Sequence, residues 1–159
     1  MQSNEENYIT MAIRKGVPAK TYELFKTYLD MLAMSYNAEH YEDFKKIGKW
    51  FYKPKEQKLD EKDYGQAKRC AENSINTSDT TGKRISVGFM FLEDIPIPIE
   101  HIVNLVTDEK NTVSVYDTSP GSKNQNTWYF LVETSLVLLK HLNDIPGNRA
   151  NPPEMLLDA

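Results

Sequence analysis

The spacing of apolar residues changes near Gly82, and this change limits the chain to a fold that combines helices with a sheet. Before it, apolar residues recur every three or four positions, most clearly over 19–36, where no Pro or Gly interrupts the pattern. After it, 84–92 is rich in β-branched and aromatic residues, and 112–118 alternates between apolar and polar positions. These patterns are typical of amphipathic helices and of strands. We therefore predict an α+β fold, with N-terminal helices packed on a C-terminal antiparallel sheet of about four strands.

The same patterns predict where the individual elements begin and end. Helices are expected over 19–36, over 38–47, from about Asp63 to Ser78, and, as a short buried helix, over 135–142. Strands are expected over 84–92, 101–107, 112–118 and 127–133. A structured loop is expected over 48–65 and a turn over 78–83.

The length of the chain fits one domain. A chain of 159 residues can bury roughly 70% of its unfolded surface, which is enough for one sizeable core. We expect a loose polar lead-in over 1–18, a single α+β domain over 19–145, and an irregular tail, rich in Pro and Asn, over 146–159.

Charge and composition indicate which partners to expect. The net charge of -4 provides no strong attraction to nucleic acid or to an anionic membrane. Residues 45–69 hold nine Lys or Arg and four Asp or Glu, with aromatic residues between them, a composition also found in proteins that bind single strands. The mixed charge favours a solvated surface instead, so nucleic acid is not an expected partner. Trp50 and Tyr52 remain candidate binding residues within this segment.

The chain has the features expected of a soluble cytoplasmic protein. Its N-terminus lacks the basic start and apolar core of a signal peptide, and no apolar run approaches the ~20 residues needed to span a bilayer. Its single cysteine cannot form an intramolecular disulfide, which fits a reducing compartment. There is no HExxH motif, no cysteine pair and no glycine-rich phosphate loop, so we expect neither a metal nor a cofactor.

That cysteine, Cys70, is the first candidate for chemistry. Lys68 and Arg69 precede it in the third predicted helix, and positive charge lowers the pKa of a thiol and favours the nucleophilic thiolate. The alternative is a core residue, because free cysteines are often buried and Cys70 shares a helix face with Ala67 and Ser74.

Two further candidates stand at the ends of predicted strands. His101 opens a strand after a Pro-rich turn, and Asp117 closes the next strand. An aspartate beside a histidine can orient the imidazole, as in a catalytic triad. Taken singly, His101 also fits a surface position and Asp117 a turn. We expect His40 to be solvated and His141 to lie near the end of a helix.

Six short segments follow one another in a recognisable order: GKWFY (48–52), CAENS (70–74), SVGFMFLE (86–93), IPIEHIVNL (97–105), VSVYDTS (113–119) and WYFLVE (128–133). This series resembles a little-characterised family of small bacterial and phage proteins. The Cys, His, Asp order of that family is in turn similar to the papain-like and transglutaminase-like cysteine enzymes, which place the nucleophile on a helix packed against the sheet that carries the other two residues.

The resemblance implies a papain-like cysteine-dependent acyltransferase or hydrolase that acts on an amide or ester bond. Cys70 would be the nucleophile, His101 the base and then the acid, and Asp117 the residue that orients His101. Gln66, one turn before Cys70, is a candidate oxyanion donor. The substrate would be a peptide, a protein or a small amide.

The sequence departs from the family pattern directly after two of these residues. Ile102 and Val103 follow His101 where small and aromatic residues are expected, and Thr118 follows Asp117 where the family has Pro. Two alternatives therefore stay open: an enzyme-like scaffold without activity, and a non-catalytic phage-encoded protein that binds and modulates a host protein in the host cytoplasm.

Overall fold

The structure is a computed structural model that describes residues 7–35, 38–65, 69–93 and 95–134. The helices described are α1 (Tyr8–Lys15), α2 (Ala19–Ser35), α3 (Ala38–Ile47) and α4 (Cys70–Thr81), with short 3-10 helices η1 (Glu61–Asp63) and η2 (Pro120–Ser122). The strands described are β1 (Lys49–Lys53), β2 (Arg84–Leu92), β3 (Ile99–Thr107), β4 (Val113–Tyr116) and β5 (Thr127–Thr134). The predicted α+β class is confirmed, although five strands are described rather than four. The predicted helix over 135–142 and the predicted tail lie outside the described residues.

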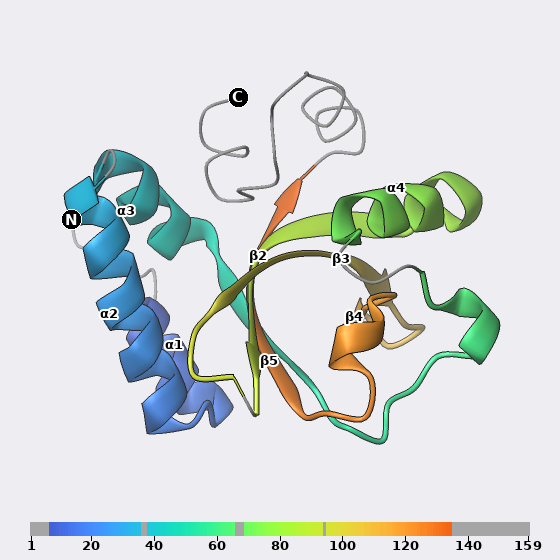
Figure 1. Cartoon of the computed structure of the whole chain (residues 1–159), viewed down its shortest axis with the longest axis horizontal. Helices are drawn as coiled ribbons and strands as arrows, with labels where there is room; N and C mark the ends of the chain where they lie inside the picture. Colours follow the sequence, from blue (N-terminus) through green and yellow to red (C-terminus); the bar gives the residue numbers. More distant parts are fainter. Residues whose placement is uncertain (1–6, 36–37, 66–68, 94, 135–159) are drawn as a thin grey trace.

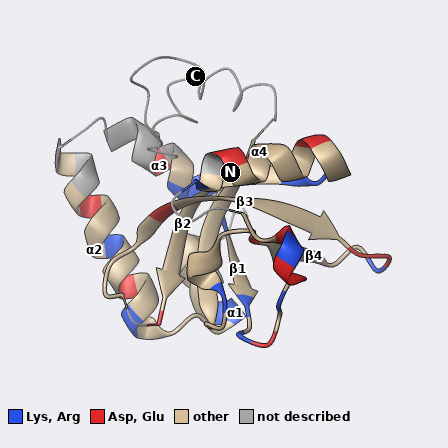
Figure 2. Cartoon of the chain, turned by 45° about the vertical axis from the view of Figure 1, so that its right-hand side comes forward, with Lys and Arg blue, Asp and Glu red and all other residues tan. Residues whose placement is uncertain are grey.

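The five strands form one antiparallel sheet in the order β1-β5-β2-β3-β4. The sheet curves so strongly that its two edge strands, β1 and β4, come into contact, and it resembles a barrel that is not fully closed (Figure 1). Helices α1–α3 lie at one side of this sheet, whereas α4 packs on β3 and β2 at the other side. Most of the sheet carries no charged residue (Figure 2). No helix in the described ranges has both the length and the apolar character needed to cross a membrane.

The core has two parts, one on each face of the sheet. Alternation along β2 directs Phe89 and Phe91 toward the N-terminal helices, where they pack edge-on against the buried Phe25 of α2. The same alternation directs Met90 toward the concave face, where it packs in a second cluster with Tyr129. The concave face therefore carries apolar side chains together with Tyr129, whose hydroxyl donates a hydrogen bond to Asp117.

Strand β1 is wrongly predicted as loop. Its aromatic residues have strand propensity, but the lysines between them hide the apolar pattern. It is a strand because each of its five residues pairs with β5, from Lys49 opposite Leu131 to Lys53 opposite Thr127. A partner more than seventy positions away along the chain leaves no local signal.

Helix α4 begins and ends later than predicted. It starts at Cys70 rather than near Asp63, and it continues through 78–81, where a turn is predicted. Thr77 and Thr81 fit inside the helix because each hydroxyl donates to the carbonyl four residues earlier. Gly82, with a φ of 74°, ends the helix in the left-handed conformation. Cys70 therefore stands in the first turn of the helix rather than in its middle.

Within the polar lead-in predicted over 1–18, the structure describes a helix, α1. Asn7 begins this helix, because its Oδ1 accepts a hydrogen bond of 2.8 Å from the Ile9 N–H, and Gly16 ends it in the left-handed conformation. Tyr8 and Ala12 are buried in the core beneath the other helices. The hydrophobic core thus includes residues before position 19.

Gly88 lies at the centre of the sheet, and Gly88→Ala should lower the free energy of unfolding by about 2 kcal/mol. A Cβ at this position would collide with the Phe130 carbonyl oxygen and would lie 3.0 Å from Leu131 Cα, both backbone atoms of β5. Urea unfolding measures the effect. Gly121→Ala is the matched control, because a Cβ there meets no atom within 4 Å. Equal unfolding midpoints for the two variants would contradict this account of the packing.

Candidate active site

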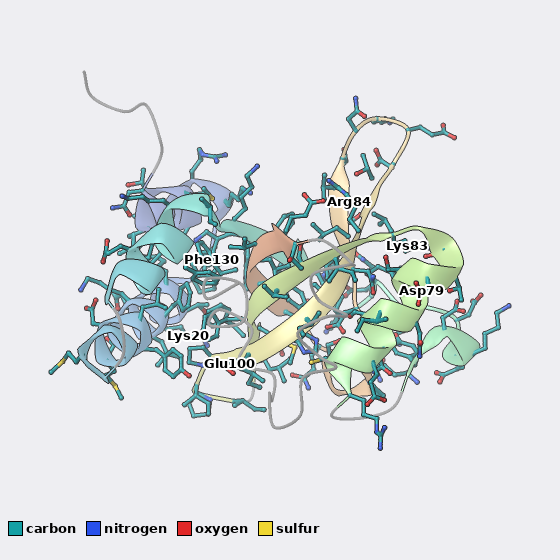
Figure 3. All side chains as sticks on the ribbon, turned by 90° about the horizontal axis from the view of Figure 1, so that it is seen from above. Lys20, Asp79, Lys83, Arg84, Glu100 and Phe130 are labelled. Atoms are coloured by element: carbon teal, nitrogen blue, oxygen red, sulfur yellow. The ribbon has the colours of Figure 1, made fainter. Side chains whose placement is uncertain are left out.

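The beginning of α4 is held against the part of β3 that β4 leaves unpaired. Within the described chain, β4 pairs with β3 only over Asn104–Thr107. At Ile102, groups of α4 make the backbone hydrogen bonds that a neighbouring strand would otherwise make. The Ser74 hydroxyl donates to the Ile102 carbonyl at 3.0 Å, and the Ile102 N–H donates to the Cys70 sulfur. The Asn104 amide adds a bond of 3.1 Å to the Ser74 carbonyl. These contacts place Cys70 beside the strand that carries His101, and Figure 3 shows α4 lying along this part of the sheet.

The structure brings together the three residues expected to carry chemistry. His101 Nε2 lies 3.1 Å from each carboxylate oxygen of Asp117. The imidazole also makes a hydrogen bond with the Cys70 thiol. Because Nε2 faces Asp117, Nδ1 is the ring nitrogen that remains for Cys70. The result is a continuous chain of contacts from thiol to imidazole to carboxylate.

Tyr129 is a fourth member of this cluster that sequence analysis missed. Its hydroxyl donates to Asp117 Oδ2 at 2.7 Å, while the Ser119 N–H donates to Asp117 Oδ1 at 2.9 Å. Its ring stacks beside that of His101, with centroids 6.5 Å apart. In the sequence Tyr129 is one aromatic residue in an apolar strand, and nothing local distinguishes it from its neighbours. The two donors hold the carboxylate in the plane needed to face His101.

Lys53 is a buried residue that contacts the loop following Asp117. This lysine is 5% exposed, and its ammonium group donates to the carbonyls of Ser122 and Gln125 at 2.9 and 3.4 Å. Ser122 and Thr127 lie near the Tyr129 hydroxyl and act to lower its pKa, but burial and the Asp117 charge outweigh them and raise it. Burial lowers the pKa of Lys53, against the opposing effect of the Asp117 charge. Lys53 thereby ties the loop after Asp117 to β1.

The electrostatics of the cluster favour an ion pair between cysteine and histidine. Burial opposes ionisation of Cys70, but the hydrogen bond and charge of His101 outweigh it, and the pKa of the thiol is lowered. Burial also acts to lower the pKa of His101, but Asp117 and Cys70 together raise it to about 10. The pKa of Asp117, despite burial, is lowered to about 2, chiefly by the His101 charge. Near neutral pH these shifts favour the imidazolium and the carboxylate, and they make the Cys70 thiolate easier to form than that of an ordinary cysteine.

Solvent exposure differs among the three residues. His101 and Asp117 are 4% and 3% exposed, whereas Cys70 is only partly buried. The imidazole and the carboxylate are therefore shielded from water more completely than the cysteine residue is. Such shielding strengthens the charge interactions within the cluster.

Of the other candidate residues, the structure describes Trp50 and Tyr52, and neither contacts the cluster. Trp50 is fully buried and its indole N–H donates to the Tyr8 carbonyl at 2.8 Å, so its side chain belongs to the core beside the N-terminal helices. Tyr52 is 44% exposed and its ring packs on Trp128, with centroids 4.7 Å apart. Gln66 lies outside the described residues, as do the side chains of His40 and His141.

Comparison with known proteins adds no relative to this description. No protein-family model, curated protein or solved structure matches the chain. The geometry of the cluster is therefore the basis for assigning a function to the protein.

Tyr129→Phe should lower the free energy of unfolding by about 1.5 kcal/mol near neutral pH, because it removes a buried hydrogen bond to an ionised carboxylate. It should also raise the pKa of Asp117, so that acid unfolding begins at a higher pH. Urea unfolding at several pH values measures both effects. Tyr52→Phe is the matched control, since it removes a hydroxyl that bonds Asn126 at the surface. The same acid midpoint in both variants would contradict a role for Tyr129 in holding Asp117.

Proposed function

We propose that the protein is a papain-like cysteine hydrolase or acyltransferase that acts on an amide or ester bond. The observation that carries this proposal is the contact chain in which His101 hydrogen-bonds the Cys70 thiol and has its Nε2 3.1 Å from both oxygens of Asp117. A thiol with a paired, oriented imidazole has the arrangement that nucleophilic catalysis requires. The placement of Cys70 at the start of a helix, beside a sheet that carries His101 and Asp117, supports the papain-like comparison.

The proposed reaction has two steps. The Cys70 thiolate attacks the carbonyl carbon of the substrate, and the His101 imidazolium gives its proton to the leaving amine or alcohol, which leaves an acyl group on the sulfur. Water, or another acceptor, then attacks the thioester while His101 takes a proton from it, and the thiolate is released. Asp117 keeps the ring oriented and stabilises its positive charge in both steps.

The start of α4 suits the developing oxyanion. The first N–H groups of a helix have no acceptor within the helix, and Cys70 is the first residue of α4. Such N–H groups can donate to the oxyanion that forms when the carbonyl is attacked. Gln66 remains a proposed additional donor.

Trapping of an acyl-enzyme tests the proposal directly. We expect p-nitrophenyl acetate to release a rapid burst of p-nitrophenolate, about one equivalent per protein, and to leave an acetyl group on the peptide that contains Cys70. Cys70→Ala should show only the slow background reaction of surface lysines. A burst of equal size in Cys70→Ala, or acetylation only at lysines, would refute the proposal.

We propose binding to a host protein as the second candidate function. It is favoured by exposed apolar side chains in the β2–β3 connection, where Ile95 and Ile97 are 38% and 57% exposed. Under this function Cys70→Ala should capture the same protein from a host lysate as the natural chain does, whereas Ile97→Asp should lose it. Loss of capture in Cys70→Ala alone would instead favour the enzyme.

A further inference from the structure

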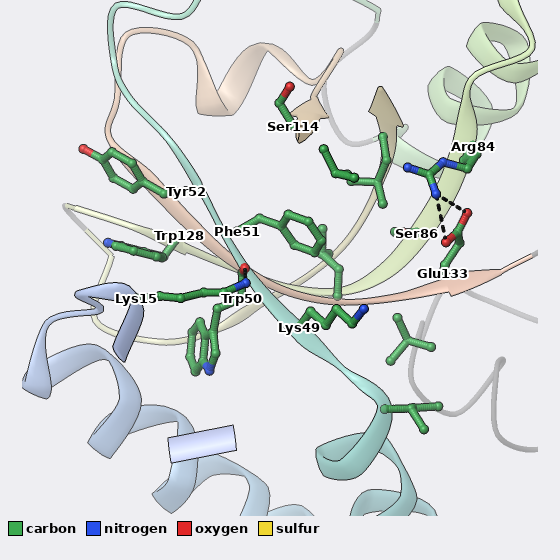
Figure 4. A pocket seen from close by; sticks show the side chains of 15 residues that line it. Lys15, Lys49, Trp50, Phe51, Tyr52, Arg84, Ser86, Ser114, Trp128 and Glu133 are labelled. Atoms are coloured by element: carbon green, nitrogen blue, oxygen red, sulfur yellow. Dashed lines mark hydrogen bonds and ion pairs between the residues drawn. The ribbon is translucent and has the colours of Figure 1, made fainter. Parts of the chain in front are cut away.

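A groove of about 790 Å³ runs along β1, apart from the candidate active site. It is bordered by the ends of β2 and β5 at Arg84 and Glu133, and by Ser114 of β4 on its other side (Figure 4). None of Cys70, His101, Asp117 and Tyr129 belongs to its lining. The volume lies within the range of sites for small organic ligands.

One wall of the groove carries a buried hydroxyl without a partner. Ser86 is 0% exposed, and its Oγ makes no hydrogen bond with any described residue. In the sheet it lies opposite Glu133 on one side and Val103 on the other, and it is part of the lining. Burying a hydroxyl without a partner costs about 1–3 kcal/mol. A polar atom of a bound molecule would supply the missing hydrogen bond.

The neighbouring lining is apolar. Phe51 lies at the centre of the groove, and Leu105 and Leu131 are buried beside it. Phe51 itself packs against the concave-face core. A molecule that fills this part of the groove must therefore bring an apolar body of its own.

The polar lining has an excess of positive charge. Three cationic side chains, Lys15, Lys49 and Arg84, line the groove together with one carboxylate, that of Glu133. Lys15 donates to the Trp50 carbonyl at 2.9 Å, and Arg84 lies 3.3 Å from Glu133. The sum of these four charges is +2, which favours an anion even after the Arg84–Glu133 pair is formed.

We propose that this groove binds a small amphipathic carboxylate. Its apolar body lies on Phe51, Leu105 and Leu131, its charged group faces Lys49 and Arg84, and an oxygen accepts the hydrogen bond of Ser86. The site does not depend on the proposed acyl-transfer function, because it shares no residue with the cysteine cluster.

Tryptophan fluorescence can test this site, because both tryptophans of the chain, Trp50 and Trp128, line the groove. Titration of the full chain with octanoate should give a saturable change, and octanamide, which lacks the charge, should bind at least about fivefold more weakly. Lys49→Gln and Ser86→Ala should each weaken octanoate binding by about fivefold to tenfold. Lys110→Gln, which changes an exposed lysine outside the lining, and Cys70→Ala should bind octanoate as the natural chain does.

The proposal fails if octanoate gives no saturable change, since the groove would then hold only water. It also fails if octanamide binds equally well, or if Lys49→Gln and Ser86→Ala retain full affinity. Thermal unfolding of each variant separates loss of binding from loss of fold. Ser86→Ala should not lower the melting temperature, because its hydroxyl has no partner among the described residues.

Discussion

His101→Gln should slow the alkylation of Cys70 by iodoacetamide at about pH 6 on the order of 100-fold. In the natural chain the hydrogen bond and charge of His101 overcome the effect of burial and lower the pKa of the thiol. Without the imidazolium, burial and the nearby Asp117 charge both act to raise that pKa, opposed by the hydrogen bond from the Ile102 N–H. The thiolate would then be a small fraction at pH 6. Glutamine keeps a side chain of similar length but cannot carry the charge.

The single cysteine makes this measurement unambiguous, because every alkylated molecule is modified at Cys70. Protein unfolded in urea is the control, since there the natural chain and His101→Gln should react at equal rates. Comparable rates in the folded proteins as well would mean that His101 does not activate the thiol.

Asp117→Asn should lower the free energy of unfolding by about 3 kcal/mol near pH 6, because it leaves the buried His101 without its anionic partner. The two oxygens of Asp117 accept hydrogen bonds from His101, from Tyr129 and from the Ser119 N–H. The substitution replaces one of these oxygens with an amide nitrogen, which cannot accept a hydrogen bond. Urea unfolding followed by circular dichroism measures the loss. Asp60→Asn is the control, because Asp60 is exposed and caps no helix through its side chain. Equal losses in the two variants would contradict the buried ion pair.

The same pair predicts how stability depends on pH. The pKa of Asp117 falls to about 2 on folding, so its contribution is complete above the ordinary carboxyl pKa of about 3.9 and disappears as the pH drops toward 2. The pKa of His101 rises to about 10, so its contribution is complete below about pH 6.5 and disappears as the pH climbs toward 10. Considered by themselves, Asp117 and His101 give the highest stability between about pH 4 and 6.5. Cys70, whose pKa is lowered on folding, offsets part of the loss from His101 up to the ordinary thiol pKa of about 8.5. In Asp117→Asn, the free energy of unfolding should depend less on pH at both the acid and the alkaline limit.

The three residues that meet in the candidate site could be predicted from the order of Cys70, His101 and Asp117 along the chain and from the resemblance that this order supports. His101 lies on β3 and Asp117 directly follows β4, and the patterns of both strands are clear in the sequence. Cys70 is expected in a helix, although it stands at the start of α4 rather than in the middle. Tyr129 and Lys53 could not be predicted, since the contacts that distinguish them depend on how β5 and β1 pair across the sheet. The same long-range pairing explains why β1 is expected as a loop while the bounds of β2 match the prediction over 84–92. Local patterns indicate the elements, whereas the neighbours within a sheet depend on the whole fold.

Ultraviolet absorbance of the thiolate, followed from acid to alkaline pH, tests the central claim most directly. The difference between the natural chain and Cys70→Ser isolates Cys70 from the nine tyrosines, which also absorb when they ionise. An ion pair with His101 predicts a thiolate already present at neutral pH, with a midpoint well below the ordinary value of about 8.5. A midpoint at or above that value in the folded protein would contradict the pairing of Cys70 with His101 and the proposed function built on it.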